Sequence, residues 1–173
     1  MSGSSHEKKL FKRLLHSHHD LMHARACARQ ILKRSLYEAP RGSDDWEMLE
    51  CLNTALVVSY WRPFSDNQNT EDVRSTLPNS YLRELTPEER MLHKHIGEYR
   101  NRDHAHSDPE SRSIAITVEF WKGPVAIPIG RDPFVPLLAE DVRLLEGMIE
   151  KLLQKIIAEQ VRIQGQLDVG DRF

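Results

Sequence analysis

The sequence predicts an all-α protein: a bundle of four or five helices that run up and down, with one β-hairpin before the last long helix. Three observations support this prediction. Apolar residues recur at spacings of three, four and seven over most of the chain, which is typical of amphipathic helices. Capping residues and breakers separate these stretches. Residues 114 to 129 instead alternate along the chain as strands do.

The composition favours a single helical domain over residues 1–173. With 39% hydrophobic and 29% charged residues, the chain is typical of a globular protein. No apolar run approaches the roughly 20 residues of a bilayer span, and no apolar block follows the start of the chain. We therefore expect a cytoplasmic protein with no membrane partner. The net charge of −2 excludes a globally basic nucleic-acid binder.

The first two elements are predicted as long helices. One runs from His6 to Tyr37 and is ended by Ala39-Pro40-Arg41-Gly42. In the other, Asp44 is the expected N-cap, with Glu47 three residues later as in a capping box, and the helix stops before Pro63. Their apolar stripes are Leu10, Leu14, Leu21, Ala24, Ile31 and Leu32 in the first, and Trp46, Leu49, Leu52, Leu56, Val57 and Tyr60 in the second.

A polar loop at about 65 to 85 precedes the third helix. A short helical turn around Tyr81 to Leu85 would interrupt this loop. Thr86-Pro87-Glu88-Glu89 is the clearest helix start in the chain, because Thr is a good N-cap, Pro suits the first helical position, and Glu completes a capping box. Leu92, Ile96 and Tyr99 then form an inward stripe.

The alternating residues at about 113 to 130 predict a hairpin that turns at Lys122-Gly123-Pro124, with Pro128 in an edge strand. Two strands alone are marginal, so the hairpin must lie on the helices or pair with another chain. The last helix has a wide apolar seam, which predicts a bundle wall that also contributes to a dimer. This seam begins with Leu138, Val142, Leu145, Ile149, Leu152 and Ile156.

Two groups of reactive side chains have simple interpretations. Cys27 and Cys51 lie in separate helical segments without CxxC spacing, so we expect two buried free thiols. His16, His19 and His23 share one helical face at a spacing that can hold a metal. Because Asp20 is their only acidic neighbour, a solvated histidine-rich face is preferred, and no metal or cofactor is expected.

The strongest candidate site is the end of the third helix, Tyr99-Arg100-Asn101-Arg102-Asp103-His104-Ala105-His106-Ser107-Asp108. An arginine followed some residues later by a histidine is a weak pattern, because Arg13 and Arg90 also satisfy it. Arg100 differs in being followed directly by Asn101 and then by His106, late in a capped helix of a helical protein.

This string resembles the HEPN superfamily, small helical bundles marked by Arg, a polar residue, and a His four to six residues later. The resemblance covers Arg100-Asn101 and His106 closely and the helices from about Leu10 to Ile157 loosely. It implies a homodimer with facing motif helices and, in many members, metal-independent RNA cleavage by toxins or phage-defence effectors. Other members bind nucleotides, and an antitoxin or regulatory protein is an implied partner.

Carried across, the resemblance implies that Arg100 holds the scissile phosphate, Asn101 orients the site, and His106 is the acid/base group. A guanidinium matches phosphate oxygens with a planar fork of donors. Imidazole, with a pKa of about 6.5, exchanges protons at neutral pH. The nucleophile is the 2′-hydroxyl of the RNA, so cleavage leaves a 2′,3′-cyclic phosphate and tolerates EDTA.

Accessory residues complete the candidate site. They are His104, Asp103, Arg102 and Arg62. Either His104 or His106 could be the working imidazole, and Asp103 could neutralise a neighbouring arginine. Arg62 belongs to Trp61-Arg62-Pro63-Phe64, which either lines a cleft beside the motif or closes the end of the bundle.

Two questions stay open: how Arg100 and His106 come together, and which function they serve. On an unbroken α-helix, Arg100 and His106 would lie roughly 120° apart. They converge if the helix loosens near Ala105 or if a second subunit supplies the partner group. Three functions are considered: an endoribonuclease, a non-catalytic nucleotide-binding or anion-binding module, and a structural homodimer. A salt-bridged helix end would explain the same residues without any function.

Overall fold

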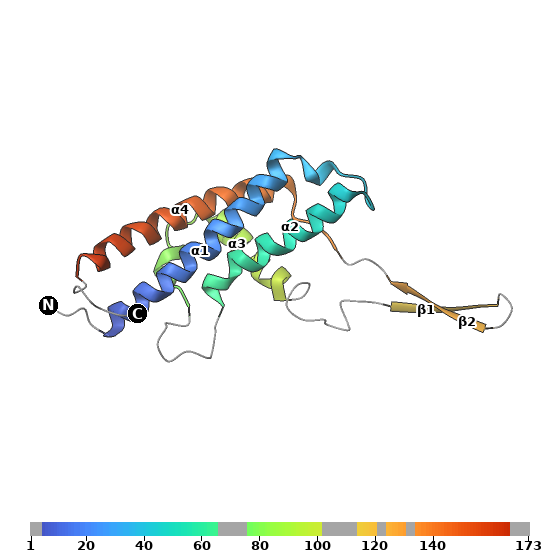
Figure 1. The fold of residues 1–173 in the computed structure, drawn as a ribbon, viewed down its shortest axis with the longest axis horizontal. Coiled ribbons are helices and arrows are strands. Elements are labelled where there is room, and N and C mark those ends of the chain that lie inside the picture. Colours follow the sequence, from blue (N-terminus) through green and yellow to red (C-terminus); the bar gives the residue numbers. More distant parts are fainter. Residues whose placement is uncertain (1–4, 66–75, 102–113, 121–123, 131–133, 167–173) are drawn as a thin grey trace.

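The structure, a computed structural model, describes residues 5–65, 76–101, 114–120, 124–130 and 134–166. Within these ranges it has four α-helices: α1 (Ser5–Lys33), α2 (Asp44–Trp61), α3 (Pro87–Tyr99) and α4 (Ala139–Gln164) (Figure 1). The prediction of a mainly helical protein is therefore confirmed. Among the described helices, none combines the length and the apolar character that a membrane span requires.

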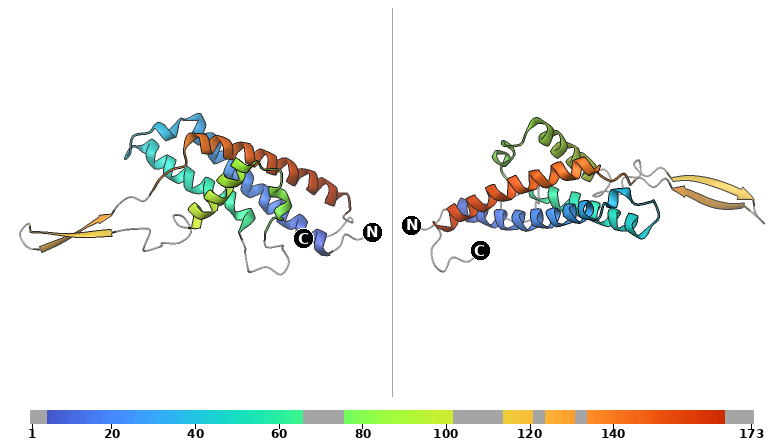
Figure 2. Two further views of the ribbon diagram at one scale, coloured as in Figure 1. Left: turned by 180° about the vertical axis from the view of Figure 1, so that it is seen from behind. Right: turned by 90° about the horizontal axis from the view of Figure 1, so that it is seen from above.

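Successive helices run in opposite directions. Arg25 and Arg29 on α1 pair with Glu150 and Glu146 on α4, so residue numbers rise along one helix as they fall along the other. Hydrogen bonds between α1 and α2, and between α2 and α3, follow the same antiparallel order. Figure 1 shows α1 lying between α4 and α2, and Figure 2 shows α3 on the opposite side of α4 from α1. The helices therefore alternate up and down.

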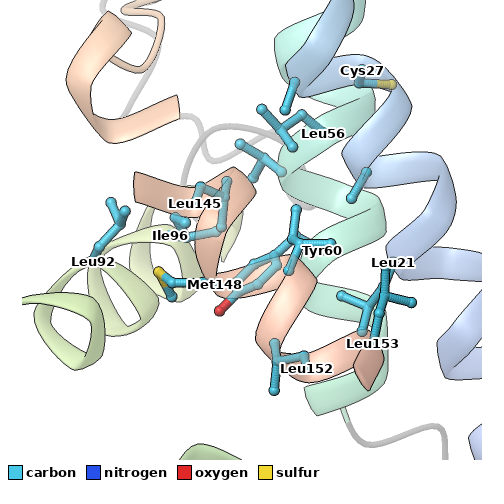
Figure 3. Packing of buried hydrophobic residues seen from close by; sticks show 14 of the residues in the cluster. Leu21, Cys27, Leu56, Tyr60, Leu92, Ile96, Leu145, Met148, Leu152 and Leu153 are labelled. Carbon is cyan, nitrogen blue, oxygen red and sulfur yellow. The ribbon is translucent and has the colours of Figure 1, made fainter. Parts of the chain in front are cut away.

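The hydrophobic core lies where the four helices meet. In Figure 3, Leu92 and Ile96 on α3 face Met148 on α4, with Tyr60 of α2 nearby and Leu21 of α1 on the far side. All five side chains are buried. Burying apolar surface stabilises the folded state by about 25 cal/mol for each Å² removed from water. This contact region therefore contributes strongly to the free energy of folding. The predicted inward stripe of α3 is buried throughout.

The first helix ends earlier than predicted. α1 stops at Lys33 rather than Tyr37, because Ser35 adopts a left-handed backbone conformation with φ of 50°. The chain then forms a 3₁₀ turn, Leu36–Glu38, which buries Leu36 against the core. A non-glycine residue with positive φ cannot continue an α-helix, and composition alone does not reveal it.

The predicted N-cap of the second helix is wrong by one residue. Ser43, not Asp44, is the N-cap, and its Oγ accepts the N–H of Trp46 at 3.2 Å. The expected capping box between Asp44 and Glu47 is therefore absent from α2. Asp44 and Glu47 instead lie in the first turn, where their negative charges suit the positive end of the helix dipole.

One predicted burial is also wrong. Cys27 is buried, but Cys51 is exposed on α2, although both thiols are free. Leu138, the N-cap of α4, is 59% exposed, and its predicted contribution to a dimer stays a prediction. Val142 and Leu145 are buried as predicted.

The polar loop and the predicted hairpin are only partly described. A 3₁₀ helix, Asn79–Leu82, lies near the predicted helical turn and buries Tyr81, whereas residues 66–75 lie outside the described residues. Two strand segments, β1 (Ile114–Phe120) and β2 (Pro124–Gly130), pair antiparallel with Ile114 opposite Gly130. The predicted turn at 122–123 lies outside the described residues, as do the connections to the helices. The hairpin as a decoration of the bundle therefore stays a prediction.

Candidate functional site

The motif helix, α3, begins at the predicted capping box. Thr86 Oγ1 accepts the N–H of Glu89 at 3.2 Å, and Glu89 Oε2 accepts the N–H of Thr86 at 2.8 Å. Lys151 of α4 also donates to Glu89 at 2.7 Å. Burial alone would raise the pKa of Glu89, but the hydrogen bonds from Lys151 and Thr86 outweigh it and hold the pKa below its ordinary value. The start of the helix is thus fixed both locally and against α4.

The middle of α3 packs through His93, which the sequence analysis did not identify as important. Its Nδ1 lies 2.9 Å from the hydroxyl of Tyr60, and its ring centroid lies 4.9 Å from that of Trp61 and 4.7 Å from that of Phe64. Burial lowers the pKa of His93 to about 4. The imidazole is therefore neutral at neutral pH, and its Nδ1 shares a hydrogen bond with the Tyr60 hydroxyl.

Trp61 brings α2 and α3 into close approach. Its ring covers Gly97, where an added Cβ would lie only 2.6 Å from Trp61 Cζ2. Trp61 and Phe64 also contact each other, with ring centroids 5.9 Å apart. These contacts agree with the interpretation that the segment 61–64 closes the end of the bundle.

The accessory candidate Arg62 is held against α1. Its carbonyl accepts a bond from Arg13 Nη2 at 2.7 Å, and its guanidinium lies 3.5 Å from Asp20 Oδ1. Within the described residues Arg62 bonds to neither Arg100 nor Asn101. A role of Arg62 as a phosphate contact stays a prediction.

At its end, α3 widens into a π turn at Arg100 and Asn101. Such turns are rare and occur often at functional sites. A loosening near Ala105 is one of the two ways in which Arg100 and His106 could converge, and Ala105 itself lies outside the described residues. Arg100 Nη1 donates to Asn101 Oδ1 at 3.1 Å, so the guanidinium and the amide lie side by side. Among the described residues, no carboxylate pairs with Arg100.

The remaining motif residues lie outside the described residues. They are Arg102, Asp103, His104 and His106. The structure thus brings together the first two members of the predicted site, Arg100 and Asn101. The position of the imidazole relative to them stays a prediction.

One buried polar network beside Arg100 was missed by the sequence analysis. Asn53 of α2 accepts the N–H of Leu137 at 3.1 Å and donates to the Tyr99 hydroxyl at 3.4 Å. Tyr99 in turn donates to the carbonyl of Val135 at 2.6 Å. The signal in the sequence is an Asn within the apolar stretch of the second helix, because a buried amide must find hydrogen-bond partners.

A groove of about 510 Å³ lies on the outer face of α2, lined in part by His23, Cys51, Val58 and Arg62. His23 Nδ1 lies 2.9 Å from Ser59 Oγ at its edge. His16, His19 and His23 are exposed, which agrees with a solvated histidine-rich face. In the part of the chain that the structure describes, no three His, Cys, Asp or Glu side chains are placed to hold a metal.

No protein-family model, no curated protein and no solved structure matches this chain. The functional assignment therefore rests on the residues of the chain and on the resemblance of its motif.

Proposed function

We propose that this protein is a HEPN-like, metal-independent endoribonuclease that acts as a homodimer. The observation that carries the proposal is the Arg100–Asn101 pair, a guanidinium beside an amide on the π turn that ends α3. Among the described residues no carboxylate pairs with Arg100, which supports a role for its charge in holding an anionic ligand. The motif resemblance implies that this anion is an RNA phosphate.

The Arg100 side chain has enough donors for this role. A guanidinium carries five N–H donors in a planar fork, and the bond to Asn101 uses one of them. The others are sufficient for two phosphate oxygens. Asn101 would hold the fork in a fixed orientation without titrating. His106 would remove the proton of the 2′-hydroxyl or protonate the leaving 5′-oxygen.

A dimer would supply both proton-transfer groups. One histidine cannot be protonated and unprotonated at the same moment, so a concerted reaction needs two groups. A two-fold arrangement with facing motif helices would provide His106 from each copy. Light scattering should therefore give twice the mass of the 20.1 kDa chain, whereas a monomer at every concentration would contradict this part of the proposal.

The test is RNA cleavage in EDTA by the wild type, Arg100→Ala and His106→Ala. Removing one group that stabilises transition-state charge lowers kcat by about 10²–10³-fold, so both variants should lose at least that much. Arg90→Ala is the matched control, because Arg90 is exposed on the same helix. Equal rates in all four proteins would reject the proposal. His104→Ala would show which imidazole is the acid/base group, because only the substitution of that histidine should abolish cleavage.

A second candidate function uses the same guanidinium without catalysis. The Arg100 guanidinium beside Asn101 also suits a nucleotide or another anion. A ligand that binds only the folded state raises its thermal midpoint. Nucleotides that stabilise the wild type but not Arg100→Ala, without RNA cleavage, would favour this binding module. Unchanged behaviour in both assays would favour a structural homodimer.

The resemblance further implies a toxin or phage-defence role for a ribonuclease of this kind, with an antitoxin or regulatory partner. Expression of the wild type should then arrest bacterial growth, and expression of Arg100→Ala should not. Growth that is unaffected by the wild type at matched protein levels would contradict this role.

A further inference from the structure

We infer that Asn53 and Tyr99 are positioning residues that fix Arg100 at the end of α3. This inference rests on the proposed function, in which Arg100 holds the phosphate. Neither residue belongs to the motif that the resemblance identifies. Both are buried, Asn53 fully and Tyr99 with 6% of its surface exposed.

The first reason is that Tyr99 immediately precedes Arg100 and is held through its hydroxyl. The oxygen accepts a bond from Asn53 Nδ2 at 3.4 Å and donates to the Val135 carbonyl at 2.6 Å. A long side chain fixed at its tip also fixes the rotation of the helical turn that carries it. Arg100, on the following π turn, therefore takes its direction from a contact with α2.

The second reason is that the same network holds the chain where it returns to the bundle. Asn53 Oδ1 accepts the N–H of Leu137, just before α4 begins. Tyr99 and Val135 are 36 residues apart in sequence but share one hydrogen bond. Asn53 thus ties the point where the chain leaves α3 to the point where it returns, and His106 lies between them in sequence.

Positioning of this kind has a large effect on a reaction that depends on alignment. A catalytic group must be held within about 0.5 Å of its productive place. A displacement of about 1 Å can lower a rate by about 10²-fold. Within the described residues the Arg100 side chain donates to Asn101, and the backbone held at Tyr99 sets the point from which this side chain extends.

The experiment compares two variants with two matched controls. Asn53→Ala and Tyr99→Phe break the network. Ser59→Ala removes another buried, hydrogen-bonded side chain from α2, and Tyr60→Phe removes another buried phenolic hydroxyl. Tyr99→Phe deletes a single oxygen atom and should therefore still fold. It can be used to test the inference if Asn53→Ala does not fold. The readouts are the NMR signals of the Arg100 backbone and side chain, and the kinetics of RNA cleavage in EDTA.

We expect similar losses of thermal stability in variants and controls, but different effects on the site. Asn53→Ala should move the Arg100 signals although position 53 is remote in sequence, whereas Ser59→Ala should not. Asn53→Ala and Tyr99→Phe should lower kcat by at least about tenfold with little change in KM, because they displace a group used in the transition state. The double variant should be no slower than the slower single variant, since one network is broken either way.

Failure of this inference and failure of the proposed function would look different. If the wild type cleaves RNA and Asn53→Ala matches Ser59→Ala in kcat and in the Arg100 signals, the positioning role is overturned and the nuclease stands. If the wild type does not cleave RNA but only the network variants move the Arg100 signals, the nuclease fails while the positioning of Arg100 is supported.

Discussion

The two ends of α3 are built in different ways. Its start depends on four consecutive residues, Thr86 to Glu89, which form a reciprocal capping box. Its end depends on distant residues: Trp61 covers Gly97, and Asn53 bonds to Tyr99. The start is therefore encoded mainly by neighbouring residues, with one added bond from Lys151 of α4, whereas the place of Arg100 is encoded by the tertiary fold. Variants along α3 should separate these two contributions.

Lowering the pH should reduce the free energy of unfolding more than any of the substitutions below. The reason is His93, which lies in the middle of α3 and has a lowered pKa. Burial lowers the pKa of His93 to about 4, whereas an unfolded histidine titrates at about 6.5. The unfolded state therefore binds more protons between these values, so stability falls as pH falls from about 6.5 to about 4. The loss attributable to His93 is at most about 3 kcal/mol. Urea unfolding at pH 7, 5.5 and 4.5 measures it.

His93→Asn is the matched variant for this measurement, because the Asn amide can donate to or accept from the Tyr60 hydroxyl but does not titrate. Its stability should fall less over the same pH range. Parallel pH dependences in the wild type and the variant would show that His93 is not responsible.

Gly97→Ala should weaken the C-terminal end of α3. The new Cβ would overlap the Trp61 ring, and overpacking of this kind costs about 1–3 kcal/mol, partly offset by about 1 kcal/mol of helix propensity. Gly147→Ala on α4 is the control, because nothing lies within 4 Å of its added Cβ. It should stabilise the protein by up to about 1 kcal/mol. The same sign for both substitutions would contradict the close approach of Trp61.

Glu89→Ala should weaken the N-terminal end by about 1–2 kcal/mol, because it removes the capping box and the bond from Lys151. Since the pKa of Glu89 is lowered on folding, its stabilising effect is present above the usual carboxyl pKa and is lost as pH falls through the lowered value. Glu88→Ala, an exposed neighbour, should change urea stability far less. Equal losses in the two variants would argue against the box.

Glu98→Ala should have the smallest effect. Its pair with Lys94 spans 3.7 Å, and both side chains are more than half exposed. Exposed pairs of this spacing contribute about 0.3–0.5 kcal/mol in helices. A loss as large as that of Gly97→Ala would mean that surface charge, rather than packing, fixes the end of α3.

The sequence predicted what local chemistry determines. The helical class, the start at Thr86 and the inward stripe with Ile96 follow from spacing and capping, and the structure confirms them. The roles of Asn53 and His93 could not be predicted in detail, because each depends on a partner more than 30 residues away. The helix break at Ser35 depends on one backbone angle that composition does not determine.

The candidate site divides in the same way. The motif singles out Arg100 and Asn101, whose side chains share a hydrogen bond, but their role as a site stays a prediction. The bond from Tyr99 to Val135, which we infer to orient them, is a contact that no spacing rule reveals. A sequence pattern can therefore propose the residues of a site, but it does not show the tertiary contacts that would align them.

The most direct test of the central claim is the chemistry of the RNA ends formed in EDTA. Mass spectrometry of the products should show 2′,3′-cyclic phosphates with the wild type and with Arg90→Ala, and none above background with Arg100→Ala. Cyclic phosphates formed equally by Arg100→Ala, or products of the wild type that end in a 3′-hydroxyl, would contradict the assignment of Arg100 as the phosphate-holding group of a metal-independent ribonuclease.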